Sequence, residues 1–300
     1  MGPTASGKTK LAIELCKYLP FKIISVDSCL IYKYMNIGTG KLNINKQKKY
    51  PHFLIDMLDP KERYSVYSFR KNVLLKIKKI LKDGYIPLLV GGTMLYYKSL
   101  LKNFSPLPSS NVYIQKNILK FINNNNQKLH SYLNIFDSSS SKKIHKNDHR
   151  RLLRALEVYY ISGKKFSELL KLSKKKFPYS IIQFAILPKN KSWLYKRVVL
   201  RFKKMISLGF QKEVEFLFNR GDLHKNLPSI KCIGYKQMWK YLSNEVTFLE
   251  MFNNTINETM QLAKKQMTWL RNWKNIYWLK SGNINKSIKK IISVKYILKC

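Results

Sequence analysis

The sequence predicts an α/β fold: a doubly wound parallel sheet that carries a phosphate-binding loop (P-loop) and is interrupted by a helical insertion. A glycine-rich motif at residues 2–9 leads directly into an amphipathic stretch. Strand and helix patterns then alternate through residue 102, the rhythm of parallel βαβ units. A polar segment follows that carries an Asn run and a Ser run and has few strand signals.

The motif at residues 2–9, Gly-Pro-Thr-Ala-Ser-Gly-Lys-Thr, matches the P-loop pattern G-x-x-x-x-G-K-[ST] at every position. Its glycines allow backbone N–H groups to curl around phosphate oxygens. Lys8 supplies a positive charge, and the Thr9 hydroxyl is a ligand for Mg²⁺. The amphipathic stretch at residues 8–19 predicts a helix whose N-terminal dipole faces the anion. The motif leaves open whether the ligand is ATP or another diphosphate.

The remaining elements follow from the spacing of apolar residues. The continuous apolar run at residues 86–90 is typical of a central parallel strand. Strands are predicted at residues 22–26, 53–58, 86–90 and 184–187, and helices at residues 65–82, 94–102, 191–208 and 254–273.

A helical insertion is predicted at residues 106–180. The prolines and serines around residues 105–110 break the alternation, and the serines at residues 138–141 are expected to form a loop. We therefore expect residues 1–105 and 181–300 to form the catalytic core with C-terminal helices.

A P-loop normally follows a central strand, but only Met1 precedes this motif. Without that strand, two neighbouring strands would keep unpaired edges inside the core. We therefore expect about ten further residues upstream, including a strand of ordinary length.

The charge is strongly basic, with 57 Lys and Arg against 16 Asp and Glu, a net charge of +41. Such a field favours a polyanionic partner, either nucleic acid or an anionic membrane. The abundance of Lys, Asn and Ile also fits A/T-rich codons, so compositional bias is an alternative explanation. Clustered arginines are more informative, because the guanidinium is a planar, forked donor. The clusters are Arg150, Arg151 and Arg154, and Arg197 and Arg201.

The cysteines are scattered at Cys16, Cys29, Cys232 and Cys300, with no C-x-x-C pair. This pattern argues against a disulfide framework and against a zinc site, and it fits a reducing cytoplasm. No apolar run approaches the ~18 residues that a membrane-spanning helix needs.

Asp27 and Ser28 follow the strand predicted at residues 22–26. The carboxyl end of a parallel strand beside a P-loop is where open α/β sheets bind ligands. A carboxylate there can act as a general base or hold Mg²⁺. An Asp-Ser pair is also a common turn or helix cap, so spacing alone leaves both readings open.

Further blocks decide between them, because together with the P-loop they resemble the bacterial tRNA dimethylallyltransferases, the IPP transferase family. The blocks occur in family order between residue 2 and about residue 280. They are the P-loop, ISVDS at 24–28, IYK at 31–33, IGT at 37–39, LVGGTMLY at 89–96, RLLRALEV at 151–158, LPSIKCIGY at 227–235 and QLAKKQMTWLR at 261–271.

The resemblance implies transfer of a dimethylallyl group from dimethylallyl diphosphate to N6 of the adenine at tRNA position 37, beside the anticodon. It implies a cytoplasmic monomer whose partners are tRNA and dimethylallyl diphosphate, with Mg²⁺ as cofactor and no membrane partner. Asp27, Thr4 and Arg201 would be catalytic, and Thr9 would hold the metal. The diphosphate- or nucleotide-binding residues would be Gly2, Pro3, Thr4, Ala5, Ser6, Gly7, Lys8 and Thr9. The tRNA-binding residues would be Asp27, Ser28, Cys29, Leu30, Thr93, Arg150, Arg151, Leu152, Leu153, Arg154, Lys231, Cys232, Ile233, Gly234, Tyr235 and Lys236.

Some positions depart from the family pattern. Leu30 stands where glutamine is common, and Gly40 and Leu42 stand where alanine and proline are usual. Lys231 and Lys236 replace common arginines, which keeps the charge but loses the forked donor. None of these positions carries the expected chemistry.

Three other functions compete with this one. A small-molecule kinase with a P-loop would need an acceptor site and a lid, and would use ATP. A non-catalytic RNA-binding protein would not need Thr4, Lys8 and Asp27 intact. A prenyltransferase acting on free nucleotides would not need the helical insertion or the strong positive charge.

Overall fold

The structure is a computed structural model that describes residues 1–101, 105, 107–125, 127–172 and 177–297. Lys102, Pro106 and Cys300, on which parts of the sequence analysis rest, lie outside the described residues. The chain divides into two compact units. The first contains Met1–Tyr64, Ser68–Tyr97 and Ser180–Cys300, and the second, helical unit contains Ser65–Tyr67 and Lys98–Tyr179.

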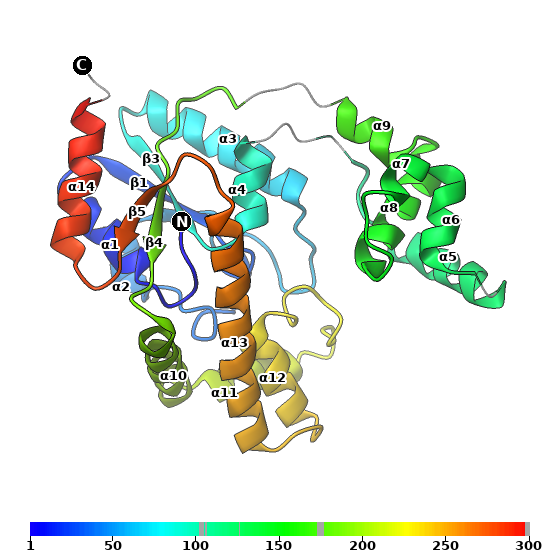
Figure 1. Cartoon of the computed structure of the whole chain (residues 1–300). Coiled ribbons are helices and arrows are strands. Elements are labelled where there is room, and N and C mark those ends of the chain that lie inside the picture. Colours follow the sequence, from blue (N-terminus) through cyan, green and yellow to red (C-terminus); the bar gives the residue numbers. More distant parts are fainter. Residues whose placement is uncertain (102–104, 106, 126, 173–176, 298–300) are drawn as a thin grey trace. The chain divides into compact units, whose positions relative to one another are not determined.

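Parallel strands form the centre of the first unit (Figure 1). β1 (Phe21–Val26) lies between β2 (His52–Phe53) and β3 (Ile86–Gly91), while β4 (Phe184–Leu187) pairs separately with β5 (Tyr277–Lys280). Ile23, Ile24 and Val26 of β1 are at most 1% exposed, as expected for a strand covered on both faces. The prediction of an α/β fold with parallel strands is therefore confirmed.

Helices cover these strands. Leu11 and Leu15 pack with Ile186 of β4, Leu279 of β5 and Ile288 in one apolar cluster. The helices lying wholly or partly in the first unit are α1 (Lys8–Leu15), α2 (Ile44–Lys49), α3 (Val66–Lys82), α4 (Met94–Leu101), α10 (Lys191–Ser207), α11 (Phe210–Phe218), α12 (Ile233–Leu242), α13 (Phe248–Arg271) and α14 (Ile284–Ile297).

Three element boundaries differ from the prediction by four residues or more. The helix expected at residues 8–19 ends at Leu15. The other two differences have local reasons. The strand expected at residues 53–58 ends at Phe53, because Leu54 and Asp56 adopt left-handed backbone conformations with φ of 64° and 52°. α13 begins at Phe248 rather than at residue 254. Thr247 and Glu250 form a capping box there, each side chain accepting a hydrogen bond from the other's backbone N–H.

The helical unit has a core of its own, which includes Ile118, Leu133, Leu152 and Leu156. The loop expected at residues 138–141 is wrong: Ser138–Ser141 form α7, and the Asp137 side chain caps it by accepting from the backbone N–H of Ser140. The unit's helices are α5 (Val112–Asn124), α6 (Leu129–Phe136), α7, α8 (His149–Ser162) and α9 (Phe166–Lys171).

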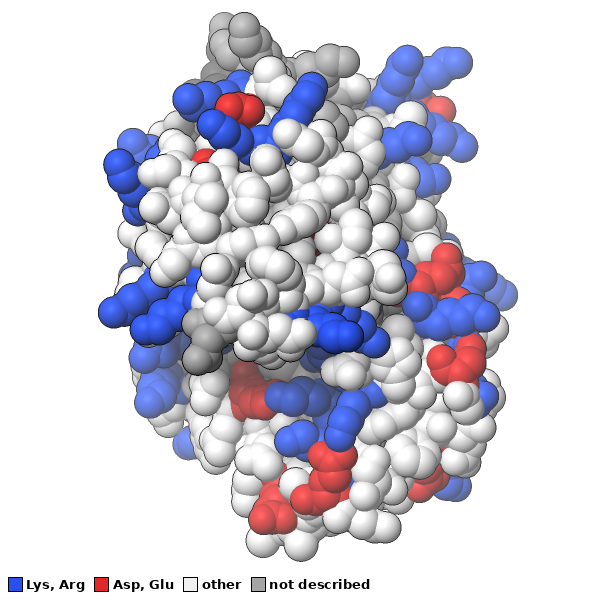
Figure 2. Space-filling model, turned by 90° about the vertical axis from the view of Figure 1, so that its right-hand side faces the viewer, with Lys and Arg blue, Asp and Glu red and all other residues white. Residues whose placement is uncertain are grey.

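Basic side chains are spread over the one face that Figure 2 shows. Figure 2 shows Lys and Arg side chains scattered over the face in view, with wide uncharged areas between them. This distribution is compatible with a polyanionic partner and with compositional bias. Within the described part of the chain, no helix is both long and apolar enough to cross a bilayer.

Candidate active site

The turn at residues 2–9 has the backbone that its glycines predict. Gly7 has φ of 97° and immediately precedes α1, and Ala5 also lies in the left-handed region with φ of 59°. The Lys8 ammonium folds back and donates to the Pro3 carbonyl at 2.6 Å. No acidic residue occupies the first turn of α1, so the helix N-terminus faces the turn with its positive end unopposed.

Positive charge gathers on this turn from two elements. Burial lowers the pKa of the Lys8 ammonium to about 8, while the Asp27 carboxylate acts in the opposite direction. From α10, Arg197 Nε donates to the Ala5 carbonyl at 2.8 Å, and an Arg201 amino group contacts the Thr4 hydroxyl at 3.4 Å. Burial lowers the pKa of the Arg201 guanidinium, and the charge of Asp27 again acts in the opposite direction. An anion in the turn would remove the unfavourable concentration of positive charge.

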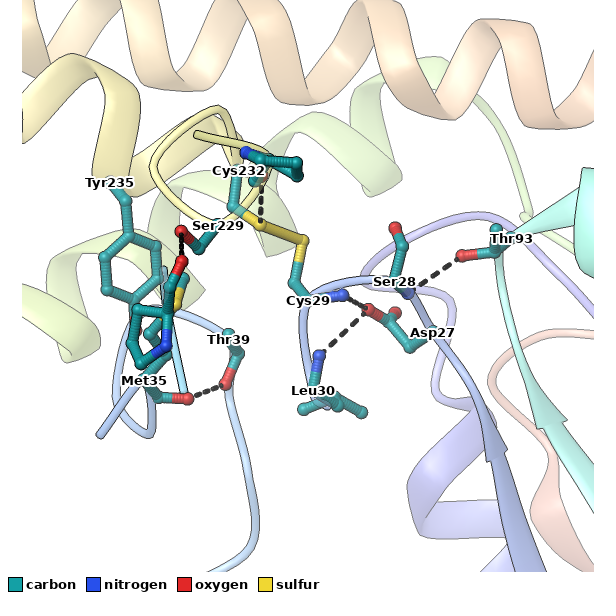
Figure 3. The surroundings of a disulfide bond; sticks show 12 residues. Asp27, Ser28, Cys29, Leu30, Met35, Thr39, Thr93, Ser229, Cys232 and Tyr235 are labelled. Atoms are coloured by element: carbon teal, nitrogen blue, oxygen red, sulfur yellow. Dashed lines mark hydrogen bonds between the residues drawn. A yellow bond between two sulfur atoms is a disulfide. The ribbon is translucent and has the colours of Figure 1, made fainter. Parts of the chain in front are cut away.

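Asp27 lies at the carboxyl end of β1, as predicted (Figure 3). One of its oxygens accepts from the backbone N–H of Cys29 at 2.8 Å and of Leu30 at 3.4 Å. The Ser28 N–H donates to the Thr93 hydroxyl at 3.2 Å, which ties the end of β1 to the residues after β3. The other carboxylate oxygen of Asp27 accepts neither of the bonds from Cys29 and Leu30, so it is available to a substrate.

A cleft of about 1930 Å³ opens beside these groups within the first unit. Other predicted site residues, among them Ser28, Cys29 and Thr93, stand next to it without lining it. The predicted site residues that line the cleft are Thr4, Ala5, Gly7, Lys8, Thr9, Asp27, Leu30 and Arg201.

Gln266 on α13 is a site residue that the sequence did not single out. Its side-chain oxygen accepts from the Thr4 N–H at 2.8 Å, and its amide donates to the Gly92 carbonyl at 2.8 Å. Gln266 is 8% exposed and joins the turn at residues 2–9 to the end of β3. The only sequence signal was a polar residue on the buried face of a helix, and that pattern does not name a partner.

The segment at residues 231–236 has mixed surroundings at the start of α12. Lys231 is exposed, whereas the Tyr235 side chain is fully buried and donates its hydroxyl to Glu213 at 2.6 Å. Burial, with the Glu213 charge, raises the pKa of Tyr235 well above its usual value. Lys236 forms an ion pair with Glu258 at 2.6 Å. Lys231 is therefore the best placed of these side chains to meet a polyanion.

Cys29 and Cys232 are joined by a disulfide with a Cα–Cα distance of 6.3 Å, so the expectation of no disulfide is wrong (Figure 3). The two residues are 203 positions apart, and the sequence offered no reason to place them together. The bond links the loop after β1 to the residue that caps α12. Both cysteines had been predicted to contact tRNA.

The helical unit's arginine cluster, Arg150, Arg151 and Arg154, does not behave uniformly. Arg150 and Arg151 are exposed on α8, and Arg151 pairs with Asp148 at 3.3 Å. Arg154 instead donates to Glu157 and to the Pro108 carbonyl. Leu152 lies in the unit's core and Leu153 packs against it, so both side chains support the helix.

The residues present suit Mg²⁺ only in part. Among the described residues, no three His, Cys, Asp or Glu side chains gather into a metal-binding group. Thr9 and Asp27 do line the same cleft. Mg²⁺ commonly binds through one or two protein oxygens plus substrate phosphates, so this pair fits an ion that arrives with a diphosphate.

An α/β core whose parallel strands end at a cation-lined cleft is typical of enzymes that bind phosphorylated substrates. The chain belongs within that class to the IPP transferase family, whose model matches residues 30–273. It is 54% identical over 276 residues to a tRNA dimethylallyltransferase of Buchnera aphidicola (strain Tuc7), covering 92% of this chain and 91% of the relative.

Solved structures agree with this assignment. The tRNA isopentenylpyrophosphate transferase of Bacillus halodurans superposes with a TM-score of 0.71 at 33% identity, covering 98% of this chain and 93% of the other. A eukaryotic dimethylallyltransferase acting on tRNA gives a TM-score of 0.80 at 25% identity, covering 99% of this chain and 78% of the other.

Proposed function

We propose that this protein transfers the dimethylallyl group of dimethylallyl diphosphate to N6 of the adenine at tRNA position 37. Membership of the family supports the reaction. The observation that carries the proposal for this chain is that Asp27 lines one cleft together with Lys8 and Arg201. Burial lowers the pKa of both cations, and the Asp27 charge offsets part of that effect. A base and a diphosphate site are both required, and the cleft offers both.

The turn at residues 2–9 acts as the P-loop for the diphosphate. Backbone N–H groups at the start of α1 and the Lys8 ammonium bind its oxygens, and Arg201 closes the site beside Thr4. Their charges stabilise the negative charge that develops on the leaving diphosphate. The loop therefore binds a leaving group and does not transfer a phosphate. Thr9 and the diphosphate oxygens would hold Mg²⁺, which would neutralise part of that charge.

Asp27 is the general base. The adenine N6 forms a bond to the allylic carbon as the bond from that carbon to the diphosphate oxygen breaks. The N6 proton passes to the free carboxylate oxygen of Asp27. The backbone bonds to the other oxygen hold the carboxylate in place for this transfer.

The target adenine must leave its base stack to reach the cleft, and anticodon loops permit this because their bases can be splayed out. The exposed Arg150 and Arg151 of the helical unit would contact phosphates of the anticodon arm, and Lys231 would contact the tRNA beside the cleft. We expect a cytoplasmic monomer.

We further propose that β-forming residues added before Met1 would lengthen the pairing that Met1 makes with β4. The Met1 N–H donates to the Phe184 carbonyl at 2.7 Å, and the Ile186 N–H donates to the Met1 carbonyl at 3.0 Å, so Met1 pairs with β4. An extension before Met1 that carries about five or six β-forming residues should raise the free energy of unfolding, because more backbone would pair with the neighbouring strand. An equally long Gly/Ser extension is the control, and equal stabilities would contradict the proposal.

The decisive experiment is incubation with labelled dimethylallyl diphosphate and unmodified tRNA, followed by nucleoside analysis. Labelled N6-(dimethylallyl)adenosine is expected, and it should disappear when the adenine at position 37 is replaced by guanine. Transfer of phosphate from labelled ATP without prenyl transfer would instead identify a kinase. Prenylation of free adenine nucleotides in preference to tRNA would identify the nucleotide prenyltransferase.

A further inference from the structure

The Glu213 side chain of α11 has an unusual number of partners. One carboxylate oxygen accepts from the backbone N–H groups of Asn36 and Ile37, each at 2.8 Å. The other accepts from the Gly38 N–H at 3.1 Å and from the Tyr235 hydroxyl at 2.6 Å. Four donors fix the carboxylate, and the carboxylate in turn fixes three successive peptide units.

The 36–41 loop, which these peptide units begin, is held closely at both ends. A Cβ at Gly38 would lie 2.1 Å from a ring carbon of Phe210, so this backbone lies directly against the core. At the other end, the Lys41 side chain is 2% exposed and donates to Asp56 at 2.5 Å. A negative side chain therefore anchors the first part of the loop, and a positive side chain anchors the last.

Between these anchors, the loop presents a backbone carbonyl to the proposed diphosphate site. One amino group of Arg201 donates to the Thr39 carbonyl at 3.0 Å, and the other contacts the Thr4 hydroxyl at 3.4 Å. Because the guanidinium is planar, these two contacts set its orientation relative to the turn at residues 2–9. Movement of the Thr39 carbonyl would therefore turn Arg201 away from the diphosphate.

We propose that Glu213 is a positioning residue for diphosphate binding: it fixes the 36–41 loop, whose Thr39 carbonyl orients Arg201 toward the leaving group. The inference deepens the proposed function and rests on it. The Tyr235 hydroxyl shares the Glu213 carboxylate, so the segment at residues 231–236, expected on the tRNA side, is braced by the same group.

The first test is Glu213→Gln, which places an amide N–H donor among donors and removes the charge. The Kd for dimethylallyl diphosphate should rise roughly tenfold, the cost of weakening one hydrogen bond to a charged group. The matched control is Glu215→Gln on the same helix, whose carboxylate accepts from Gln211 at 2.8 Å and does not touch the loop. Equal Kd values for the Glu213 variant and the wild type would overturn the proposal.

The second test is a double-mutant cycle with Arg201→Lys. If Glu213 acts through Arg201, Glu213→Gln should cost much less when the forked guanidinium is already absent. An undiminished loss in the Arg201→Lys background would indicate general destabilisation and overturn the proposal. Should Glu213→Gln fail to fold, Glu213→Asp keeps the charge with a shorter reach. It should raise the same Kd by a smaller factor, and an unchanged Kd would overturn the proposal.

These tests measure binding, so they can be read separately from transfer. A wild-type protein that binds dimethylallyl diphosphate without modifying tRNA would contradict the proposed function, and the cycle would still decide the role of Glu213. A wild-type protein that binds no dimethylallyl diphosphate would overturn both.

Discussion

Arg201 in the first unit and Arg154 in the helical unit were both expected to bind phosphates, yet their hydrogen-bond partners differ. Arg201 donates to the Thr39 carbonyl and the Thr4 hydroxyl, and burial lowers the pKa of its guanidinium, which disfavours the charged form. Arg154 donates to Glu157, whose side chain is fully buried and also accepts from Ser110 and Asn111. The first guanidinium lacks a carboxylate partner in this set of bonds, whereas the second is neutralised.

The difference shows that an arginine cluster alone does not identify a phosphate site, because one of its guanidinium groups can already be paired with a carboxylate. Burial tends to raise the pKa of Glu157, but the donors from Arg154, Ser110 and Asn111 outweigh it and hold the pKa below its usual 4.5. The stability contributed by this pair is therefore present above about pH 4.5 and is lost as the pH falls through the lowered pKa. Arg154 therefore has a structural role, whereas Arg201 is the arginine that we propose binds the diphosphate.

The largest expected effect concerns the acid opposite Arg201. Asp27→Asn should lower kcat by about 100-fold or more, because the amide cannot accept the N6 proton. Binding of tRNA should be little changed, and single-turnover measurements would separate the two. Asp83→Asn, which removes an exposed carboxylate that does not line the cleft, is the control. Activity of Asp27→Asn within a few-fold of wild type would remove the base from the proposed mechanism.

Arg154→Ala should reduce the free energy of unfolding by about 3 kcal/mol, because it leaves a buried carboxylate without its cation. Chemical denaturation followed by circular dichroism measures this loss. Arg150→Ala, an exposed neighbour on the same helix, should change stability by less than about 0.5 kcal/mol. If the two variants were equally stable, the contrast between Arg154 and Arg201 would fail.

Lys8 allows the charge of the proposed diphosphate site to be titrated. With its pKa lowered to about 8 by burial, Lys8 loses its positive charge as the pH rises through that value. The kcat/KM for dimethylallyl diphosphate should then fall by about tenfold per pH unit, while the substrate's own charge stays constant. A pH profile with catalysis measured from pH 7 to 9.5 would check this. A flat profile across that range would mean that Lys8 does not supply the charge.

The exposed arginines should affect tRNA binding alone. Replacing Arg150 and Arg151 with Ala should lower the slope of log K against log salt by about 0.7 to 0.9 per lost phosphate contact. Binding measured over a range of KCl concentrations gives the slope, and the Kd for dimethylallyl diphosphate serves as the internal control. An unchanged slope would contradict direct contact of these two residues with phosphate.

The smallest expected effect compares matched glycines in the two units. A Cβ at Gly40, where φ is 70°, would lie 2.5 Å from an Arg201 amino nitrogen, whereas a Cβ at Gly163, where φ is 66°, would have open space. Both Ala variants carry a similar backbone cost of about 1 kcal/mol. Only Gly40→Ala should also raise the KM for dimethylallyl diphosphate, by a few-fold. Equal KM values would show that Arg201 moves aside without loss.

The sequence by itself determined the features that depend on neighbouring residues. The alternation of patterns identified β1, β3 and β4 within one residue at each end. For β3 the signal was a continuous apolar run, which is typical of a central parallel strand. The spacing within residues 2–9 predicted the glycine-rich turn and the helix after it. The order of several blocks, which no single motif provides, identified the family.

Only the tertiary structure decided which distant groups meet. Glu213 binds backbone 177 positions away, Gln266 binds Thr4 across 262 positions, and Cys29 lies beside Cys232. Such pairings depend on how helices pack against the sheet edge, and a carboxylate or thiol has the same letter whether it faces solvent or a peptide N–H. For the same reason, the sequence could place Arg154 and Arg201 in clusters but could not tell which charge was already neutralised.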